Sequence, residues 1–208
     1  MQRRGVKMEK RKVKAIVWCD IHLLGGHSLY KGQELSATEL MAKDERDYPG
    51  LVYGLGDLVD LGGCLKKDVG LAEALIWNLR CLLGRRYLQG NHELTESKLN
   101  ESLVHQGILF KHTHEEWESI YTMDRVPGVS RFRNSLLVPF YQWFRTKWQK
   151  PTTPQFLRNA VESMDKAGVK ELWGGHRHPK ELASVAVIRQ DKVYRVKVFP
   201  RGRTVIYE

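Results

Sequence analysis

The sequence has few cysteines, and they are not spaced for a metal site or a disulfide framework. Cys19, Cys64 and Cys81 are odd in number and scattered, whereas thiolate sites use closely paired cysteines and small secreted domains use several bridges. We therefore expect a reducing, cytoplasmic location. Long apolar runs are also absent. The first run ends at Asp20 after residues 15–19, far short of the roughly 20 apolar residues that span a bilayer, so neither a membrane span nor a signal peptide is expected.

The sequence also lacks internal repeats and low-complexity tracts, and its composition is that of a globular protein. Of its 208 residues, 42% are apolar, 28% are charged and 20 are aromatic (6 Trp, 8 Tyr and 6 Phe). These values exclude a disordered or fibrous chain. This length suits one α/β domain with its own core. We predict a basic N-terminal arm over residues 1–12 and a single domain over 13–208, with room for a helical insertion around 125–158.

Positive charge is in clear excess, because 34 Lys and Arg against 24 Asp and Glu give a net charge of +10. This excess favours encounters with polyanions such as nucleic acid or nucleotides. The alternative is that the cations only solvate the surface. In residues 125–158, cations alternate with aromatic side chains. That segment is therefore either a cap that stacks a nucleotide or single strand, or an ordinary buried helix face with cations on its outer side.

Apolar runs and helical spacing predict a β-α-β-α-β order in the first half of the chain. The expected strands are 13–19, 51–55 and 85–89, and the expected helices between them are 37–46 and 69–83. This order favours a sheet with crossover helices. The later elements that we expect are a helix over 154–167 closed by Gly168, a strand over 170–173, and antiparallel strands over 183–189, 193–199 and 204–207.

Side chains that can bind metals follow the expected strands. The pairs, in chain order, are Asp20 and His22, Asp57 and Asp60, Asn91 and His92, and His176 and His178. Ligands bind at the carboxyl ends of strands in α/β sheets, because the loops there converge. Carboxylate, imidazole and amide donors suit Mn, Fe or Zn. Such a set can hold two ions if one carboxylate bridges them, and the glycines at 56, 90 and 175 allow the turns to approach the ions closely.

Four short motifs in this order resemble those of the calcineurin-like metallophosphoesterase superfamily. They are Asp-Ile-His at 20–22, Gly-Asp-Leu-Val-Asp at 56–60, Gly-Asn-His-Glu at 90–93 and Gly-His-Arg-His at 175–178. The resemblance covers residues 14–178. It implies a four-layer α-β-β-α sandwich of two mixed sheets, the metallo-dependent phosphatase fold, with a dinuclear metal centre at one edge.

The resemblance also assigns metal ligands. It makes Asp20, His22 and His178 ligands of one ion, Asp57 the bridge, and Asn91 and His176 ligands of the other. The family places one more histidine between the third and last motifs. His112 fits best because it closes the apolar run 108–110, and His114 and His105 are the alternatives. Two divalent cations are thus expected, with Mn²⁺ favoured and Fe, Zn or Ni as alternatives.

The remaining motif residues are assigned by the same resemblance to catalysis and substrate binding. His92 is expected beside the scissile phosphate, where it protonates the leaving oxygen. Asp60, counted with it among the catalytic residues, is expected to hold a ligand histidine or the loop in place. The expected substrate contacts are Asn91, His92 and Arg177. Glu93 either does the same work as Asp60 or caps the helix that follows it.

The expected reaction is hydrolysis of phosphoric mono- or diesters by a metal-bridging hydroxide. Gly-Asn-His-Glu and Gly-Asp-Leu-Val-Asp are similar to the protein Ser/Thr phosphatase branch, but that branch continues Asp-Arg-Gly where this chain has Leu61 and Gly62 after Asp60. Asp-Ile-His-Leu is similar to the branch of UDP-diacylglucosamine pyrophosphatases and small phosphodiesterases. The alternatives are a nuclease or nucleic-acid end-processing phosphatase, favoured by the net charge, and a non-catalytic metal-binding scaffold.

Overall fold

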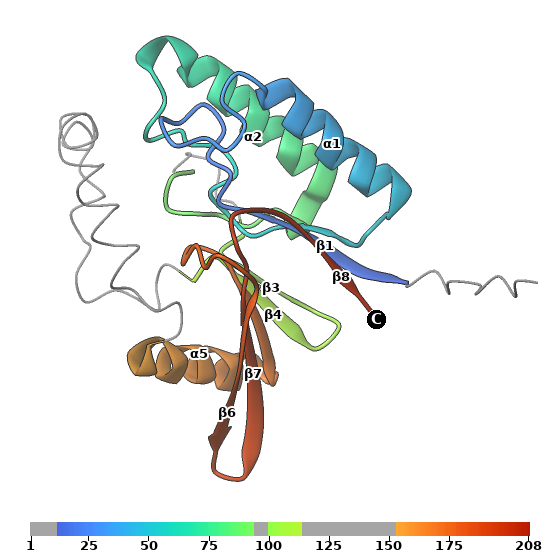
Figure 1. The fold of residues 1–208 in the computed structure, drawn as a ribbon, viewed down its shortest axis with the longest axis vertical. Helices are drawn as coiled ribbons and strands as arrows, with labels where there is room; N and C mark the ends of the chain where they lie inside the picture. The colour runs from blue at the N-terminus through green and yellow to red at the C-terminus, as the bar shows by residue number, and fades with distance from the viewer. Residues whose placement is uncertain (1–11, 94–99, 114–152) are drawn as a thin grey trace, which may run out of the picture.

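A computed structural model describes residues 12–93, 100–113 and 153–208. These residues form an α/β structure with two mixed sheets, as predicted (Figure 1). The smaller sheet has the order β2-β1-β8, with β1 over Val13–Cys19, β2 over Val52–Gly54 and β8 over Gly202–Tyr207. The larger sheet has the order β3-β4-β5-β7-β6, and its strands are Ser102–His105, Ile108–Lys111, Glu171–Gly174, Ala183–Arg189 (β6) and Lys192–Val198 (β7).

Three α-helices pack against these sheets in the described part of the chain: α1 over Glu34–Asp47, α2 over Val69–Leu83 and α5 over Pro154–Ala167. Short 3₁₀ turns cover Lys66–Asp68 and Gly84–Arg86. The predicted helices 69–83 and 154–167 are confirmed with these bounds, and the predicted helix 37–46 is α1. Within the same residues, no helix combines the length and the apolar character needed to cross a lipid bilayer. The arm up to residue 11 and residues 125–152 of the predicted insertion lie outside the described residues.

The alternation of side chains along β1 explains how the layers stack. Successive residues of a strand point to opposite faces of its sheet. Ile16 and Trp18 pack into a core shared with α1 and α2, whereas Ala15, Val17 and Cys19 pack into the core between the two sheets. All five side chains are at most 2% exposed. The two helices therefore cover the outer face of the smaller sheet, and the larger sheet lies against its inner face (Figure 1).

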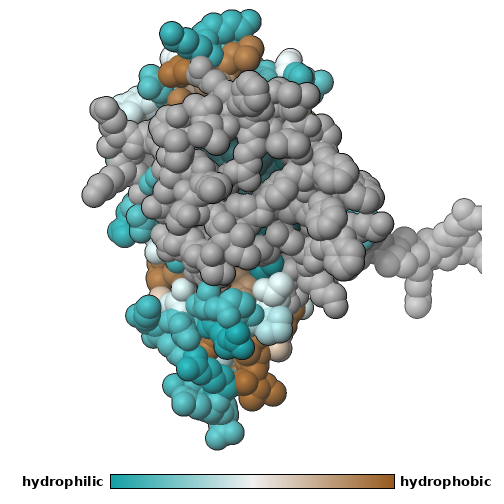
Figure 2. Space-filling view, turned by 90° about the vertical axis from the view of Figure 1, so that its left-hand side faces the viewer, coloured by the Kyte–Doolittle hydropathy of each residue, from teal (hydrophilic) through white to brown (hydrophobic). Residues whose placement is uncertain are grey.

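Helix α5 covers the outer face of the larger sheet and has clear sequence signals at both ends. The hydroxyl of Thr153 accepts a hydrogen bond from the backbone N–H of Phe156 at 3.3 Å, and Pro154 occupies the first turn. Gly168 ends the helix in the left-handed conformation, with φ 70°. Its apolar stripe packs on the sheet. Its outer face is hydrophilic, as is much of the lower end of the molecule in Figure 2.

The predicted strand over 85–89 is wrong for most of its length. Gly84 leaves α2 with φ 57°, and the next residues form a 3₁₀ turn. The guanidinium of Arg86 binds the carboxylate of Glu45 at 2.6 Å and the carbonyl of Val52 at 3.0 Å, which holds this turn against α1 and β2. Besides an isolated parallel bridge between Leu88 and Asn100, only an isolated parallel bridge between Tyr87 and β2 remains in the described residues. That bridge still carries the following residues toward the edge of the sheet where β2 ends.

The C-terminal strands are confirmed, but they do not form one antiparallel unit. Strands β6 and β7 pair antiparallel, and β7 also pairs parallel with β5 in the larger sheet. Strand β8 instead pairs antiparallel with β1 in the smaller sheet. The tail therefore joins the two sheets, and the turn between β7 and β8 lies beside the end of β1. Strand β3 was not predicted; it pairs with β4, which contains the expected apolar run.

Candidate metal centre

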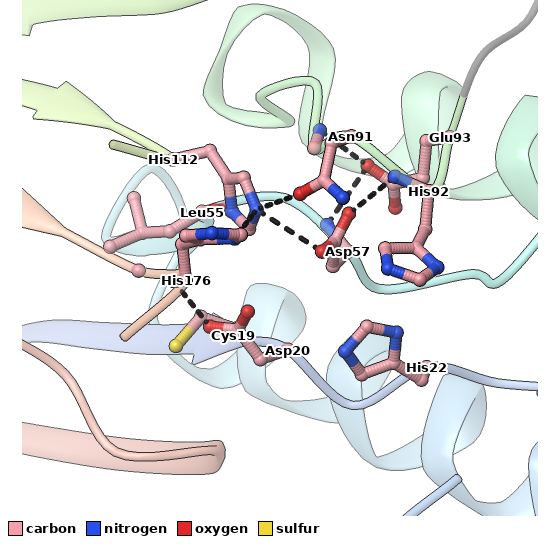
Figure 3. A network of polar contacts seen from close by, with 12 residues as sticks. Cys19, Asp20, His22, Leu55, Asp57, Asn91, His92, Glu93, His112 and His176 are labelled. Carbon is pink, nitrogen blue, oxygen red and sulfur yellow. Dashed lines mark hydrogen bonds and ion pairs between the residues drawn. The ribbon is translucent and has the colours of Figure 1, made fainter. Parts of the chain in front are cut away.

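The predicted ligands lie together in the turns that follow β1, β2, β4 and β5, and Asn91 joins them from the turn after the bridge at Tyr87; most of them are labelled in Figure 3. The backbone in these turns is unusual. Ten described residues other than glycine have a positive φ, and five of them are predicted ligands: Asp20 (53°), His22 (52°), Asp57 (51°), His176 (74°) and His178 (43°). Left-handed backbone costs free energy for such residues and persists only where surrounding contacts impose it, which is typical of functional sites.

One group of donors surrounds the imidazole of His112, which is fully buried. Its Nδ1 donates a hydrogen bond to the carbonyl oxygen of Leu55 at 2.7 Å. The other ring nitrogen, Nε2, therefore faces three polar atoms: Oδ2 of Asp57 at 3.1 Å, Oδ1 of Asn91 at 3.2 Å and Nδ1 of His176 at 3.2 Å (Figure 3). This orientation, fixed by a bond at the opposite nitrogen, is how proteins aim a histidine at a metal.

The negative charges around His112 also favour the binding of a cation. Burial alone would lower the pKa of this imidazole, but the carboxylates of Asp57 and Asp20 raise it to about 10. Burial likewise would raise the pKa of Asp57, yet His112 and His92 hold it well below its usual range. The carboxylates thus stay ionised and attract positive charge to Nε2 of His112. A divalent cation bound there would take the place of a proton.

A second group of donors lies next to the first and consists of Asp20, His22 and His178. Nε2 of His178 lies 3.0 Å from Oδ1 of Asp20, and Oδ2 of Asp20 accepts a hydrogen bond from the backbone N–H of His176 at 2.9 Å. Burial would raise the pKa of Asp20, but His178 holds it well below its usual range. Asp20 is therefore an ionised, fully buried carboxylate that is oriented from two sides.

His22 fits a metal ligand for a separate reason. Burial lowers its pKa to about 4, so the imidazole is neutral at physiological pH. Its buried Nδ1 has no hydrogen-bond partner within the described residues, and Oδ2 of Asp60 is 4.0 Å away. A buried polar atom without a partner costs free energy unless something else binds it. The side chain therefore retains unused binding capacity at the site.

The structure thus assembles two sets of donors that share one residue. Ligand atoms of Asp20, Asp57, His112 and His176 lie within 4.8 Å of one another, and so do those of Asp20, His22 and His178. Asn91 adds its amide oxygen to the first set. The shared residue is Asp20, with Asp57 beside it, whereas the family resemblance makes Asp57 the bridge. The bridging role of Asp57 stays a prediction.

The structure also pairs the two predicted catalytic residues. Nδ1 of His92 lies 2.9 Å from Oδ1 of Asp60, and the same oxygen accepts a hydrogen bond from the backbone N–H of Gly63 at 2.7 Å. Although burial opposes protonation of His92, the carboxylates of Asp57 and Asp60 raise its pKa to about 9. Asp60 thus holds both the histidine and its own loop. His22, Asp60 and His92 also form a third set of atoms within 4.8 Å.

Two glycines allow these turns to approach one another. A Cβ on Gly90 would lie 2.0 Å from Oδ1 and 2.2 Å from the backbone nitrogen of Asp57. A Cβ on Gly56, where φ is 86°, would lie 2.7 Å from Nδ1 of His112. All three distances are far below van der Waals contact. At these two positions, the lack of a side chain allows the ligand turns to approach each other, and their approach to the ions stays a prediction.

The structure describes two of the three candidates for the additional histidine. His105 lies in β3, where its Nδ1 is 2.6 Å from the hydroxyl of Tyr53, and its ring is part of an aromatic stack rather than the ligand cluster. His114 lies outside the described residues. His112 occupies the cluster, as predicted. Arg177 lies between two candidate ligands, but its guanidinium packs 4.6 Å from the ring centroid of Phe156 in α5, and its role in substrate binding stays a prediction.

Two residues at the site were missed or only partly anticipated from the sequence. Arg201, in the turn between β7 and β8, donates hydrogen bonds to the carbonyl oxygens of Asp20 at 2.9 Å and His27 at 2.7 Å. It thereby fixes the turn after β1 from a position 181 residues away in the chain. No local pattern could have identified it. Glu93 is fully buried, and burial together with the Asp57 carboxylate raises its pKa to about 7.

No family model matches this chain, and a search of curated proteins finds no match either.

Proposed function

We propose that this protein is a metal-dependent phosphoesterase of the calcineurin-like superfamily that hydrolyses phosphoric mono- or diesters. One observation supports the proposal above all others: four turns distant in the chain bring two sets of metal-binding donors together around Asp20. Two ions about 3.5–4 Å apart can clamp the attacking and leaving oxygens of a phosphoryl displacement. The order of helices, smaller sheet, larger sheet and α5, with a core at each interface, supports the four-layer sandwich of that family.

The donors suit two divalent cations, with Mn²⁺ favoured and Fe, Zn or Ni as alternatives. Asp20, His22 and His178 would hold one ion, Asn91, His112 and His176 would hold the other, and Asp57 would bind both. The unpartnered nitrogen of His22 and the orientation of His112 support this assignment. When bound, such a pair of cations lowers the pKa of water and offsets the charge on the phosphoryl oxygens.

His92 supplies the proton in this proposal. Its Nδ1 pairs with Asp60, which leaves Nε2 to face a substrate. With its pKa raised to about 9 by the neighbouring carboxylates, the imidazole carries a proton at neutral pH. A protonated imidazole beside the departing oxygen acts as a general acid. Asn91, which immediately precedes His92, lies against His112 and can contact the phosphoryl group from there.

Metal analysis followed by an ester panel tests the proposed function. We expect the purified protein to bind two divalent ions per chain and to hydrolyse aryl phosphomonoesters or phosphodiesters. Activity should disappear with a chelator and return with Mn²⁺, and a comparison with Ni, Zn and Mg would identify the preferred ion. A fully loaded protein that hydrolyses no ester would refute the proposal and support a metal-binding scaffold instead.

A nucleic-acid substrate is the second candidate, and the net charge of +10 favours it. Release of counterions makes such binding strongly dependent on salt. If DNA or RNA is the substrate, its hydrolysis below saturation should fall about 10³-fold between 50 and 200 mM salt for some six phosphate contacts. Hydrolysis of a small aryl ester, measured in parallel, should change little. Equal salt dependence of the two substrates would exclude the nuclease alternative.

A further inference from the structure

We infer that Glu93 is a positioning residue that clamps the turn bearing Asp57 to the turn bearing Asn91 and so sets the spacing of the two cation sites. The inference rests on the proposed function, because it concerns the same centre. Within the described part of the chain, Glu93 hydrogen-bonds backbone N–H groups and the Tyr87 hydroxyl, and not the side chain of a predicted metal ligand (Figure 3). Its effect would pass through the backbone that carries the ligands.

Five donors converge on the carboxylate of Glu93. Oε1 accepts from the backbone N–H groups of Leu58 at 2.7 Å and Val59 at 3.0 Å and from the hydroxyl of Tyr87 at 2.6 Å, and Oε2 accepts from the N–H groups of Asp57 at 3.1 Å and Gly90 at 3.0 Å. Three of the donors belong to the turn after β2, and a fourth belongs to the Gly-Asn-His-Glu turn. A single side chain therefore ties the two turns together.

The direction of these bonds favours the first of the two roles that the sequence left open for Glu93, which is to hold a turn in place. All five donors precede Glu93 in the chain, so its carboxylate points back into the ligand turns. Burying a carboxylate costs several kcal/mol unless donors surround it. Here four of the five donors are backbone N–H groups of the two ligand turns, so these turns themselves satisfy the buried carboxylate.

The effect of Glu93 on the metal centre depends on which groups each of its carboxylate oxygens binds. Oε2 alone joins Asp57 to Gly90, and Gly90 immediately precedes Asn91. The side chains of Asp57 and Asn91 both face Nε2 of His112. Loss of the bonds to Oε2 would leave fewer bonds between the turns of these two ligands, among them that from the N–H of His92 to Oδ1 of Asp57 at 2.8 Å, and would loosen their spacing. The three bonds to Oε1 would still hold the turn after β2. The cation site around His112 should therefore suffer more than the fold.

The variant Glu93→Gln tests separately what the two carboxylate oxygens hold. Glutamine has the shape of glutamate, but its amide group has one acceptor and one donor end. We expect the carbonyl oxygen of the amide to face the three donors that bind Oε1 in the wild type. The NH₂ group then faces the N–H groups of Asp57 and Gly90, which are donors as well, so these two hydrogen bonds are lost. Tyr87→Phe is the matched control. It removes one of the five donors and leaves all four backbone bonds in place.

The measurements are Mn²⁺ affinity, the Mn²⁺ electron paramagnetic resonance spectrum and thermal unfolding, with kcat and KM recorded for the best ester. For Glu93→Gln we expect Mn²⁺ affinity to fall about 10–100-fold, the spectrum of a coupled ion pair to give way to that of an isolated ion, and kcat to fall with little change in KM. Tyr87→Phe should retain the coupled spectrum and most of the activity.

A Glu93→Gln protein with the wild-type spectrum and kcat would overturn the inference. A Glu93→Gln protein that no longer folds would also overturn it, because Glu93 would then stabilise the fold rather than the metal centre. In that case we expect Glu93→Asp to unfold as well. If the wild-type protein binds coupled Mn²⁺ ions but hydrolyses no ester, the proposed function fails, and the spectra still decide the role of Glu93.

Discussion

Asp57→Asn is expected to abolish metal loading and hydrolysis together. The carboxylate of Asp57 lies 3.1 Å from Nε2 of His112 and accepts the backbone N–H of His92 at 2.8 Å. Asparagine fills the same space but carries no charge, so it cannot offset a divalent cation. We expect activity to fall by three orders of magnitude or more, which corresponds to about 4 kcal/mol of transition-state stabilisation. Elemental analysis and steady-state kinetics on the same sample would measure both losses.

His92→Ala is the contrasting variant, because the proposal gives His92 a proton to donate and no metal to hold. Metal content should remain that of the wild type, while kcat falls about 10²–10⁴-fold, the usual contribution of a general acid. The ligand atoms of His22, Asp60 and His92 also lie within 4.8 Å of one another. Loss of metal in His92→Ala would therefore show that His92 is a ligand. Full activity and full metal content in Asp57→Asn would contradict the whole scheme.

The sequence predicted those parts of the structure that local patterns determine. Helices α2 and α5 have the expected bounds because apolar spacing and glycine punctuation are local signals. The cluster of ligands was also predictable, since polar residues at strand ends converge wherever parallel strands share an edge. The turn at Gly84–Arg86 was not, because the contact of Arg86 with Glu45 joins residues 41 positions apart.

The support of the site was harder to predict than its ligands. Arg201 reaches the turn after β1 only because β8 returns to the smaller sheet. The backbone donors around Glu93 come from a turn about 35 residues earlier and leave no trace in side-chain spacing. Ligands are recognised by their chemistry, which the sequence displays directly. Positioning residues are recognised by their partners, which the sequence does not display.

Gly90→Ala is expected to damage the centre through contact alone. Gly90 does not have a positive φ, so alanine can adopt its backbone conformation without strain. The added methyl group, however, would lie 2.0 Å from Oδ1 and 2.2 Å from the backbone nitrogen of Asp57. One of these atoms is backbone, so the two turns must separate. Overpacking of this kind costs about 1–3 kcal/mol, and for a chain of this size the midpoint of thermal unfolding should fall on the order of 5 °C.

The functional loss in Gly90→Ala should exceed this loss of stability. Separating the turns moves Asp57 away from Asn91 and breaks the bond from Gly90 to Glu93. We therefore expect Mn²⁺ binding to be lost at temperatures where the variant is still folded, as measured by calorimetric titration below the unfolding midpoint. Gly62→Ala is the matched control, because among the residues that the structure describes its Cβ would meet only the carbonyl oxygen of His92, at 3.9 Å. Equal metal binding in the two variants would mean that the close approach of these turns is not needed for the centre.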